Sequence, residues 1–122
     1  MVLVDTSVWI NHLRKPMPEL VRLLEMEEVL THPCVIGELA CGTLTNRRSV
    51  LYNFSRLPHV SAASDSEVLE FIERRGLMGT GVGYLDMHLL ASTCMAMDVR
   101  LWTRDKKLAA LAALADQLAV TH

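Results

Sequence analysis

The stretch MVLVDTSVW, residues 1–9, decides the fold, because a short apolar run ends at an aspartate and an amphipathic segment follows it. The apolar run predicts a first strand over residues 1–4, and residues 8–13 predict a helix after a turn. Ligands gather at the C-terminal ends of strands in open parallel sheets, so Asp5 stands at a functional position. Capping of the next helix, by Asp5 or by Ser7, is the competing interpretation.

Working outward from this stretch, the chain alternates helix and strand signals. The expected helices are one that begins after Pro18 and includes residues 20–24, then 33–42, 47–57, 64–76, 84–97 and one from about residue 105. The further strands are residues 29–31 and 100–103, and the glycine-rich residues 76–83 form a flexible loop. Alternating strands and helices predict an α/β domain over residues 1–122, whose parallel sheet is covered on both faces.

Composition limits the class of protein. Hydrophobic residues make up 51% of the 122 residues and charged residues 21%, which is typical of a compact domain. No apolar run approaches the ~20 residues of a membrane helix, and the N-terminus, with Asp5 and no basic region, is not a signal peptide. The net charge of −2 argues against a broad basic face for nucleic acid. It is compatible with a phosphodiester that is held through metal ions.

The cysteines predict a reducing environment. Cys34, Cys41 and Cys94 are odd in number and show no C-x-x-C spacing, so we expect buried free thiols in the cytoplasm. A zinc site made from His32, Cys34 and Cys41 lacks closely paired ligands, and we set it aside.

Three more acidic residues, like Asp5, stand at positions that suggest either a functional or a capping role. Glu38 lies among small and apolar helix neighbours, and Asp86 is flanked by Leu85 and Met87. An unpaired carboxylate in such surroundings is costly, so Asp86 bonds a partner, caps a helix or holds a cation. Asp105 follows a strand and starts a helix, where capping is again the alternative.

The joint arrangement of Asp5, Glu38, Asp86 and Asp105 is more informative than any one of them. Carboxylates brought together repel one another by ~3 kcal/mol per pair at 5 Å and an effective dielectric constant of 20. Such a cluster needs a cation, and oxygen ligands favour Mg²⁺ or Mn²⁺ over zinc. Basic residues near Asp5 and Asp105 in the sequence either grip flanking phosphates or form a solvated face; they are Arg14, Lys15, Arg104, Lys106 and Lys107.

Other charged groups carry simpler interpretations. His88 points away from Asp86 on the same helix, and we interpret it as a histidine satisfied by a hydrogen bond. The pairs Arg47-Arg48 and Arg74-Arg75 are interpreted as surface residues. The apolar helices around residues 20–24 and 50–57 are candidate docking faces for a protein partner or a second copy.

These motifs resemble the PIN domain, and within that family the toxins of VapBC-type toxin–antitoxin pairs. The resemblance covers nearly the whole chain and rests on four motifs in order: Val4-Asp5-Thr6-Ser7-Val8-Trp9, Gly37-Glu38-Leu39-Ala40-Cys41-Gly42, Asp86-Met87-His88-Leu89-Leu90-Ala91 and Leu101-Trp102-Thr103-Arg104-Asp105. Two positions depart from the usual pattern of the family and hold His88 and Leu108. At these positions the resemblance does not define the residues at the rim of the site.

The resemblance implies a three-layer α/β/α sandwich with a central parallel sheet. It implies that Asp5, Glu38, Asp86 and Asp105 bind Mg²⁺ or Mn²⁺ for RNA hydrolysis, with Thr6 or Ser7 as a further hydroxyl. It also implies a cognate antitoxin that covers the acidic pocket, and a homodimer.

Two other functions remain open from the residues alone. One is a non-catalytic module of the same fold that binds RNA or protein, against which the intact acids count. The other is a phosphotransfer domain, either a receiver or a haloacid-dehalogenase-like phosphatase. The receiver usually has an acidic pair after the first strand and the phosphatase an Asp-x-Asp, and Asp5-Thr6-Ser7 provides neither.

Overall fold

The computed structural model describes residues 1–119 and contains the expected alternation of strands and helices. The elements are β1 (Val2–Val4), α1 (Thr6–Arg14), α2 (Pro18–Glu25), β2 (Val29–Leu30), α3 (Pro33–Cys41), α4 (Arg47–Arg56), α5 (Asp65–Arg75), α6 (Tyr84–Met95), β3 (Arg100–Trp102) and α7 (Lys106–Leu114). The sheet of this described part is parallel, in the order β2-β1-β3. The prediction of an α/β fold with a parallel sheet is confirmed.

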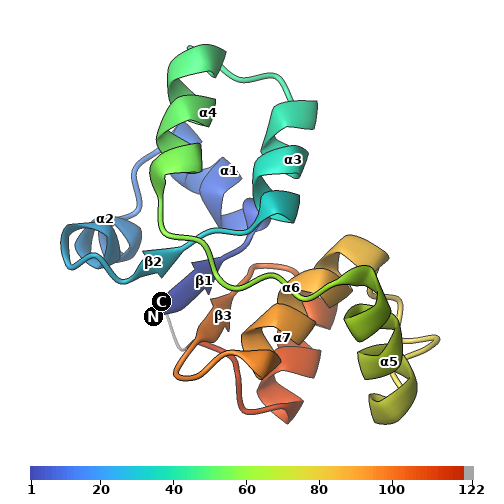
Figure 1. The fold of residues 1–122 in the computed structure, drawn as a ribbon. Coiled ribbons are helices and arrows are strands. Elements are labelled where there is room, and N and C mark those ends of the chain that lie inside the picture. Colours follow the sequence, from blue (N-terminus) through green and yellow to red (C-terminus); the bar gives the residue numbers. More distant parts are fainter. Residues whose placement is uncertain (120–122) are drawn as a thin grey trace.

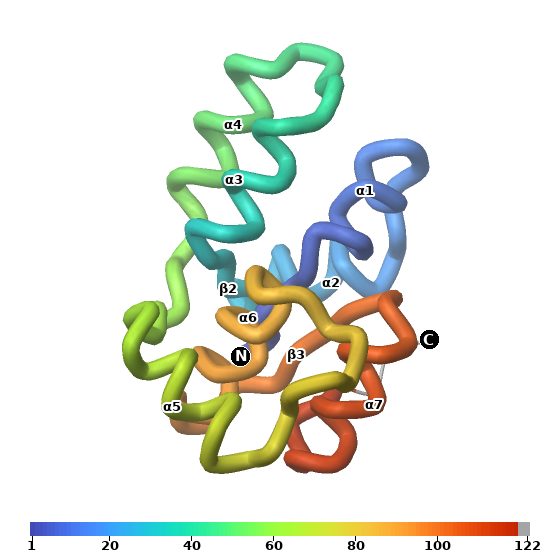
Figure 2. Tube along the Cα trace, turned by 90° about the vertical axis from the view of Figure 1, so that its right-hand side faces the viewer, coloured from blue at the N-terminus to red at the C-terminus, as the bar shows by residue number. Residues whose placement is uncertain are grey.

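The short strands lie at the centre of the molecule, between two groups of helices (Figure 1). Helices α6 and α7 pack against β3, with α5 packed on α6. On the other side α1 packs against α3, and α3 and α4 form a hairpin that projects from the body (Figures 1 and 2). The hairpin and the α5–α7 group therefore flank the edge at which the strands end.

The core explains why such short strands hold together. Leu3 of β1, Leu101 of β3 and Leu89 of α6 are fully buried. A smaller cluster around Val68 and Met87 joins α5 to α6. Each fully buried leucine contributes roughly 1.5–3 kcal/mol relative to an exposed one, so side-chain packing rather than strand length stabilises the sheet.

Local sequence signals predict most helix and strand boundaries to within two residues of their positions in the structure. The predicted capping box is present: the Ser64 hydroxyl accepts from the Glu67 N–H, and the Glu67 side chain accepts from the Ser64 N–H. The first helix begins earlier than expected, at Thr6, and the helix expected over 84–97 ends at Met95. Both differences lie at helix ends, where periodicity gives the weakest signal.

Candidate metal centre

Asp5 is placed by the sheet itself. It follows β1 directly, and its backbone N–H donates to the carbonyl oxygen of Trp102 in β3 at 2.9 Å. The side chain is only 4% exposed. It stands at the N-cap position of α1 but makes no capping hydrogen bond. The capping interpretation of Asp5 is therefore wrong.

Two hydroxyl groups orient the Asp5 carboxylate. Ser7 Oγ and Thr103 Oγ1 each donate to Asp5 Oδ2, both at 2.7 Å. The same Ser7 oxygen accepts from the Arg104 N–H at 3.0 Å, and the Thr103 oxygen accepts from the Asp105 N–H at 3.0 Å. Because an ionised carboxylate only accepts hydrogen bonds, each hydroxyl donates to Asp5 while its oxygen accepts from a backbone N–H. Both bonds go to Oδ2, which leaves Oδ1 available for another ligand.

Glu38 reaches the same place from α3. Thr6, the first residue of α1, donates from Oγ1 to Glu38 Oε1 at 2.9 Å. This contact joins residues 32 positions apart and fixes a half-buried carboxylate next to Asp5.

Asp86 completes the group from the first turn of α6. Gly83 holds the N-cap position of that helix, so the capping interpretation of Asp86 is wrong. Burial raises the pKa of Asp86 from 3.8 to about 6, with further contributions from the charges of Asp5, Glu38 and Asp105. No side chain among residues 1–119 forms a hydrogen bond or ion pair with Asp86 that offsets this burial.

Asp105 lies at the border of the cluster and has a second role. Its Oδ1 accepts from the Leu108 N–H at 2.9 Å and caps α7. The capping interpretation is thus correct for this acid. Its charge still acts on Asp86, so Asp105 is close enough to influence the group that the other three acids form.

The three inner acids have the properties of a cation site. One carboxylate oxygen from each of Asp5, Glu38 and Asp86 lies within 4.8 Å of the others. Within the described chain, no Lys or Arg side chain forms an ion pair with any of them. Oxygen donors at this spacing suit a hard divalent cation, which would relieve the repulsion that raises the pKa of Asp86.

The basic residue Arg104 is linked to the site through its main chain and is bound by Asn11 through its side chain. With its amide oriented to satisfy both groups, Asn11 accepts from Arg104 Nε at 2.7 Å and from Nη1 at 3.2 Å. Arg104 also follows Thr103, whose hydroxyl binds Asp5. The Arg104 guanidinium is therefore held against α1, while its backbone N–H donates to the Ser7 hydroxyl that binds Asp5.

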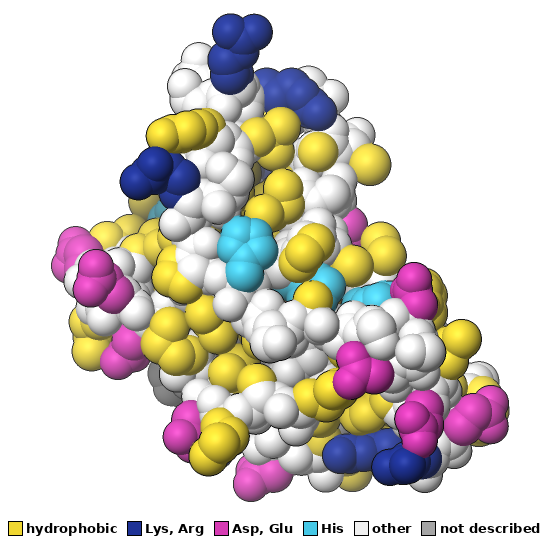
Figure 3. Space-filling view, viewed as in Figure 1, with side chains coloured by type: hydrophobic (Ala, Val, Ile, Leu, Met, Phe, Trp, Pro, Cys, Tyr) yellow, Lys and Arg dark blue, Asp and Glu magenta, His cyan; other side chains and the backbone are white. Residues whose placement is uncertain are grey.

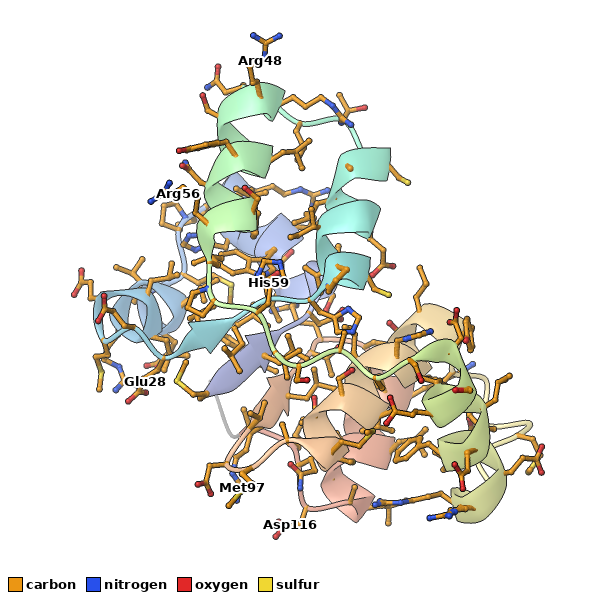
Figure 4. All side chains as sticks on the ribbon, in the orientation of Figure 1. Glu28, Arg48, Arg56, His59, Met97 and Asp116 are labelled. Carbon is orange, nitrogen blue, oxygen red and sulfur yellow. The ribbon has the colours of Figure 1, made fainter. Side chains whose placement is uncertain are left out.

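The two members of the Arg47-Arg48 pair make different contacts. Arg48 and Arg56 point outward from α4 (Figure 4), and the basic side chains on this face gather at the hairpin and beside α5 (Figure 3). Arg47 is exposed, so the surface interpretation is confirmed for it, and its guanidinium donates to the carbonyl oxygens of Ala40 and Gly42 at 2.6 and 3.2 Å. It thereby satisfies backbone groups at the end of α3.

A second group of metal-binding side chain types lies nearby: His32, Cys34 and His88, each offering one atom within 4.8 Å of the others. His32 caps α3, because its Nδ1 accepts from the Cys34 N–H at 2.9 Å. His88 Nε2 lies 2.9 Å from Asp65 Oδ1, so the interpretation of His88 as a hydrogen-bonded histidine is confirmed.

The protonation of His32 makes this second group a poor metal site. Burial lowers the pKa of His32 to about 4, so the ring is neutral at pH 7. Since Nδ1 accepts a hydrogen bond from the Cys34 N–H, the single proton of the neutral ring is on Nε2, which lies 3.3 Å from Ser92 Oγ. A metal at Nε2 would have to displace that proton. Cys41, the other cysteine of the zinc site set aside above, is exposed.

Two residues with structural roles near the site were not predicted: Thr103, which orients Asp5, and His32, which caps α3. Thr103 was not singled out, although a threonine between a buried strand and an acid that starts a helix is a usable signal. His32 was considered only as a ligand, although a polar residue before Pro33 occupies the N-cap position of α3.

The fold and the site together define a class of protein: a parallel α/β domain that brings carboxylates together at the ends of its strands. The PIN domain family model matches residues 2–114, and the chain belongs to this family. The interpretations as a receiver or a haloacid-dehalogenase-like phosphatase are therefore wrong.

Among curated proteins, the chain is similar to two forms of Ribonuclease VapC32 from Mycobacterium tuberculosis, strains CDC 1551 / Oshkosh and ATCC 25618 / H37Rv. Each is 46% identical over 113 residues, which covers 93% of this chain and 91% of the relative. Within residues 1–119, none of the helices has the length and apolar character needed to cross a bilayer.

Proposed function

We propose that this protein is an endoribonuclease that depends on Mg²⁺ or Mn²⁺ and serves as the toxin of a toxin–antitoxin pair. Membership of the PIN domain family and the similarity to a ribonuclease support the proposal. The observation that carries it is Asp86, a half-buried acid with a raised pKa beside two other acids. No structural role among the described residues accounts for it.

Each acid has its own task in this proposal. Asp5 offers the Oδ1 atom that its two hydroxyl partners leave free, and Glu38 is aligned by Thr6. Asp86 supplies a carboxylate without competing hydrogen bonds. Asp105 acts at the border through Oδ2, because its Oδ1 caps α7.

When bound, the divalent cation supplies the activation of water and the neutralisation of charge on the phosphodiester. Water then adds to phosphorus, the bond from phosphorus to the 3′ oxygen breaks, and the leaving 3′ oxygen gains the proton that the water loses, which gives a 5′-phosphate and a 3′-hydroxyl. The acids position this chemistry, and Arg104, fixed by Asn11, contacts a phosphate next to the one that is cut.

The direct test uses purified protein and a mixed RNA pool, with Mg²⁺, Mn²⁺ or EDTA. We expect cleavage with either metal and none in the chelator. Full activity in EDTA after metal-free preparation would refute the metalloenzyme, and RNA binding without cleavage would favour the non-catalytic module. Sequencing of the product ends identifies the bond that is cut.

We also propose a cognate antitoxin and a homodimer as partners. The docking faces expected from the sequence need correction, since Leu20, Leu23 and Phe54 belong to the core. The half-buried residues Leu24 and Leu57 instead line a hollow of about 270 Å³ between α1, α2 and α4. Sedimentation as a monomer at high concentration would exclude the dimer. Absence of binding to the product of the adjacent small open reading frame would exclude the antitoxin.

The proposal treats residues 1–122 as one domain in the cytoplasm. One core joins Leu3 to Ala119, which supports a single folding unit. All three cysteines are free, which suits a reducing compartment. Cooperative unfolding in one transition and a cytoplasmic location in cell fractions would agree with this.

A further inference from the structure

A cavity of about 330 Å³ lies next to the acidic cluster, between α1, α3 and the connection from α3 to α4. Glu38 lines this cavity and also belongs to the group formed with Asp5 and Asp86. Thr6 holds Glu38 at this border. A polymer bound at the acids therefore has its neighbouring unit at the mouth of the cavity.

The walls of the cavity are apolar on two sides. Ile10 and Leu13 of α1 contribute one wall, although each is 43% exposed. Leu44 and Val50 contribute to the lining from the connection and from α4. A flat ring inserted between such walls would remove apolar surface from water on both of its faces.

The remaining lining is polar. Thr43 and Thr45 bring hydroxyl groups, and both residues are exposed. A planar group with apolar faces and hydrogen-bonding edges uses both kinds of lining. A nucleobase has this chemistry, whereas an aliphatic side chain could not form hydrogen bonds with the hydroxyls.

A positively charged side chain also lines this cavity. Arg14 is part of the lining, and none of the ion pairs within residues 1–119 involves it. In a protein of net charge −2, a free guanidinium beside an acidic cluster matches the backbone of a nucleotide whose base enters the cavity. The charge pattern therefore favours a nucleotide over an apolar peptide.

We propose that this cavity is a nucleobase subsite that receives the base beside the scissile phosphate and sets the sequence preference of cleavage. The proposal rests on the proposed ribonuclease function, which it extends to substrate choice. Ile10 and Leu13 contact the faces of the base, Thr43 and Thr45 its edge, and Arg14 the adjoining phosphate.

The test fills the cavity from two sides with Leu13→Trp and, separately, Thr45→Trp. Leu114→Trp is the matched control, because Leu114 is an apolar residue of α7 that is 85% exposed. Product ends from a randomised RNA pool give the sequence preference. We expect wild type and control to share a preference at one position beside the cut. Both cavity variants should lose it and cut the preferred site at least 10-fold more slowly, with unchanged Mn²⁺ affinity.

A second measurement does not depend on cleavage. Nucleoside 5′-monophosphates are titrated into labelled wild type and Leu13→Trp, with the amide signals of Thr43 and Thr45 followed by NMR. We expect one base to shift these signals in wild type and not in the variant. If wild type cuts no RNA, the ribonuclease function fails, and this titration alone decides the subsite.

Three outcomes would overturn the subsite. The first is an unchanged sequence preference in both folded cavity variants. The second is the absence of any nucleotide-dependent shift in wild type. The third is loss of binding to a protein partner in Thr45→Trp while RNA preference is retained, because Thr45 lines this cavity and not the hollow of Leu24 and Leu57, and the cavity would then serve that partner.

Discussion

Two groups of potential metal ligands lie within the part of the chain that the structure describes, and one of the two has the character of a metal site. In each group, one atom per side chain falls within 4.8 Å of the others: Asp5, Glu38 and Asp86 in the first, His32, Cys34 and His88 in the second. Both groups draw on α3 and α6; Asp5 after β1 completes the first group, and His32 at the N-cap of α3 completes the second. Proximity and residue type alone do not separate them.

The difference lies in which ligand atoms are still available. In the second group His32 uses Nδ1 to cap α3, and His88 uses Nε2 on Asp65. In the first group hydroxyls hold one oxygen of Asp5 and one of Glu38, while no hydroxyl among residues 1–119 binds Asp86. A buried ligand set without partners is costly until a cation arrives, whereas a satisfied set is already part of the structure.

The largest expected effect is that of Asp86→Asn. The amide keeps the shape and removes a charge, so cleavage should fall on the order of 10³-fold, about 4 kcal/mol of transition-state stabilisation. Thermal melts in EDTA should show equal or higher stability, because repulsion with Asp5 and Glu38 is relieved. Asp65 is an exposed acid near the second group and provides the matched control. The Asp65→Asn variant should bind metal as tightly as wild type. A large loss of stability in EDTA would make Asp86 a structural residue.

For the second group, His32→Ala should act on stability instead. The variant loses the cap of α3, the packing of a buried ring and the partner of Ser92, for a total of about 3 kcal/mol. Urea unfolding measures this loss, with His59→Ala as the exposed control. Mn²⁺ affinity of the folded variant should equal that of wild type. Loss of metal binding with intact folding would show that the two groups had been assigned the wrong roles.

Ser7→Ala should have a smaller effect, on alignment alone. It removes one of the two hydroxyls that hold Asp5 Oδ2, and outer-shell partners of this kind are worth about 10-fold in metal affinity. Ser55→Ala is the control, since that hydroxyl donates to a backbone carbonyl in α4. Mn²⁺ titration measures the change. Equal affinity in Ser7→Ala and wild type would mean that Thr103 suffices.

The smallest effect is the pH dependence of stability in EDTA, where the two groups act in opposite directions. The raised pKa of Asp86, about 6, means that the folded state gains protons first, so this group adds stability as pH falls from about 6 to 4. The lowered pKa of His32, about 4, means that the unfolded state gains protons first, so this group removes stability as pH falls from 6.5 to 4.

The two contributions offset each other in wild type, and single variants separate them. Asp86→Asn should lose about 1 kcal/mol more than wild type between pH 6 and pH 4, after allowance for solvent screening. His32→Ala should lose less over the same range. Chemical denaturation at several pH values measures both. Parallel curves for all three proteins would contradict this account.

Much of the fold could be predicted from the sequence because its signals are local. The Ser64–Glu67 capping box, Pro33 at a helix start and the glycine-rich loop after Gly76 each act over a few residues. The acids were also found, because a carboxylate after a strand or among apolar neighbours is visible in the sequence.

The support of the site could not be predicted, because it depends on contacts between distant residues. Thr103 and Asp5 are 98 positions apart, and Thr6 and Glu38 are 32 apart. No periodicity encodes such pairs. The double role of Asp105 has the same origin, since a cap is a local feature and the electrostatic influence on Asp86 is not.

The contacts behind Asp5 have an evolutionary consequence. The hydroxyl oxygens of Ser7 and Thr103 accept hydrogen bonds from the backbone N–H groups of residues 104 and 105, and every amino acid except proline offers such a donor. The side chain at position 104 can therefore change over generations without disturbing the Asp5 carboxylate, which is two hydrogen bonds away from the backbone N–H of residue 104. A lineage could exchange Arg104 to suit a different RNA while inheriting the same metal-binding geometry, with proline as the one substitution that selection must remove.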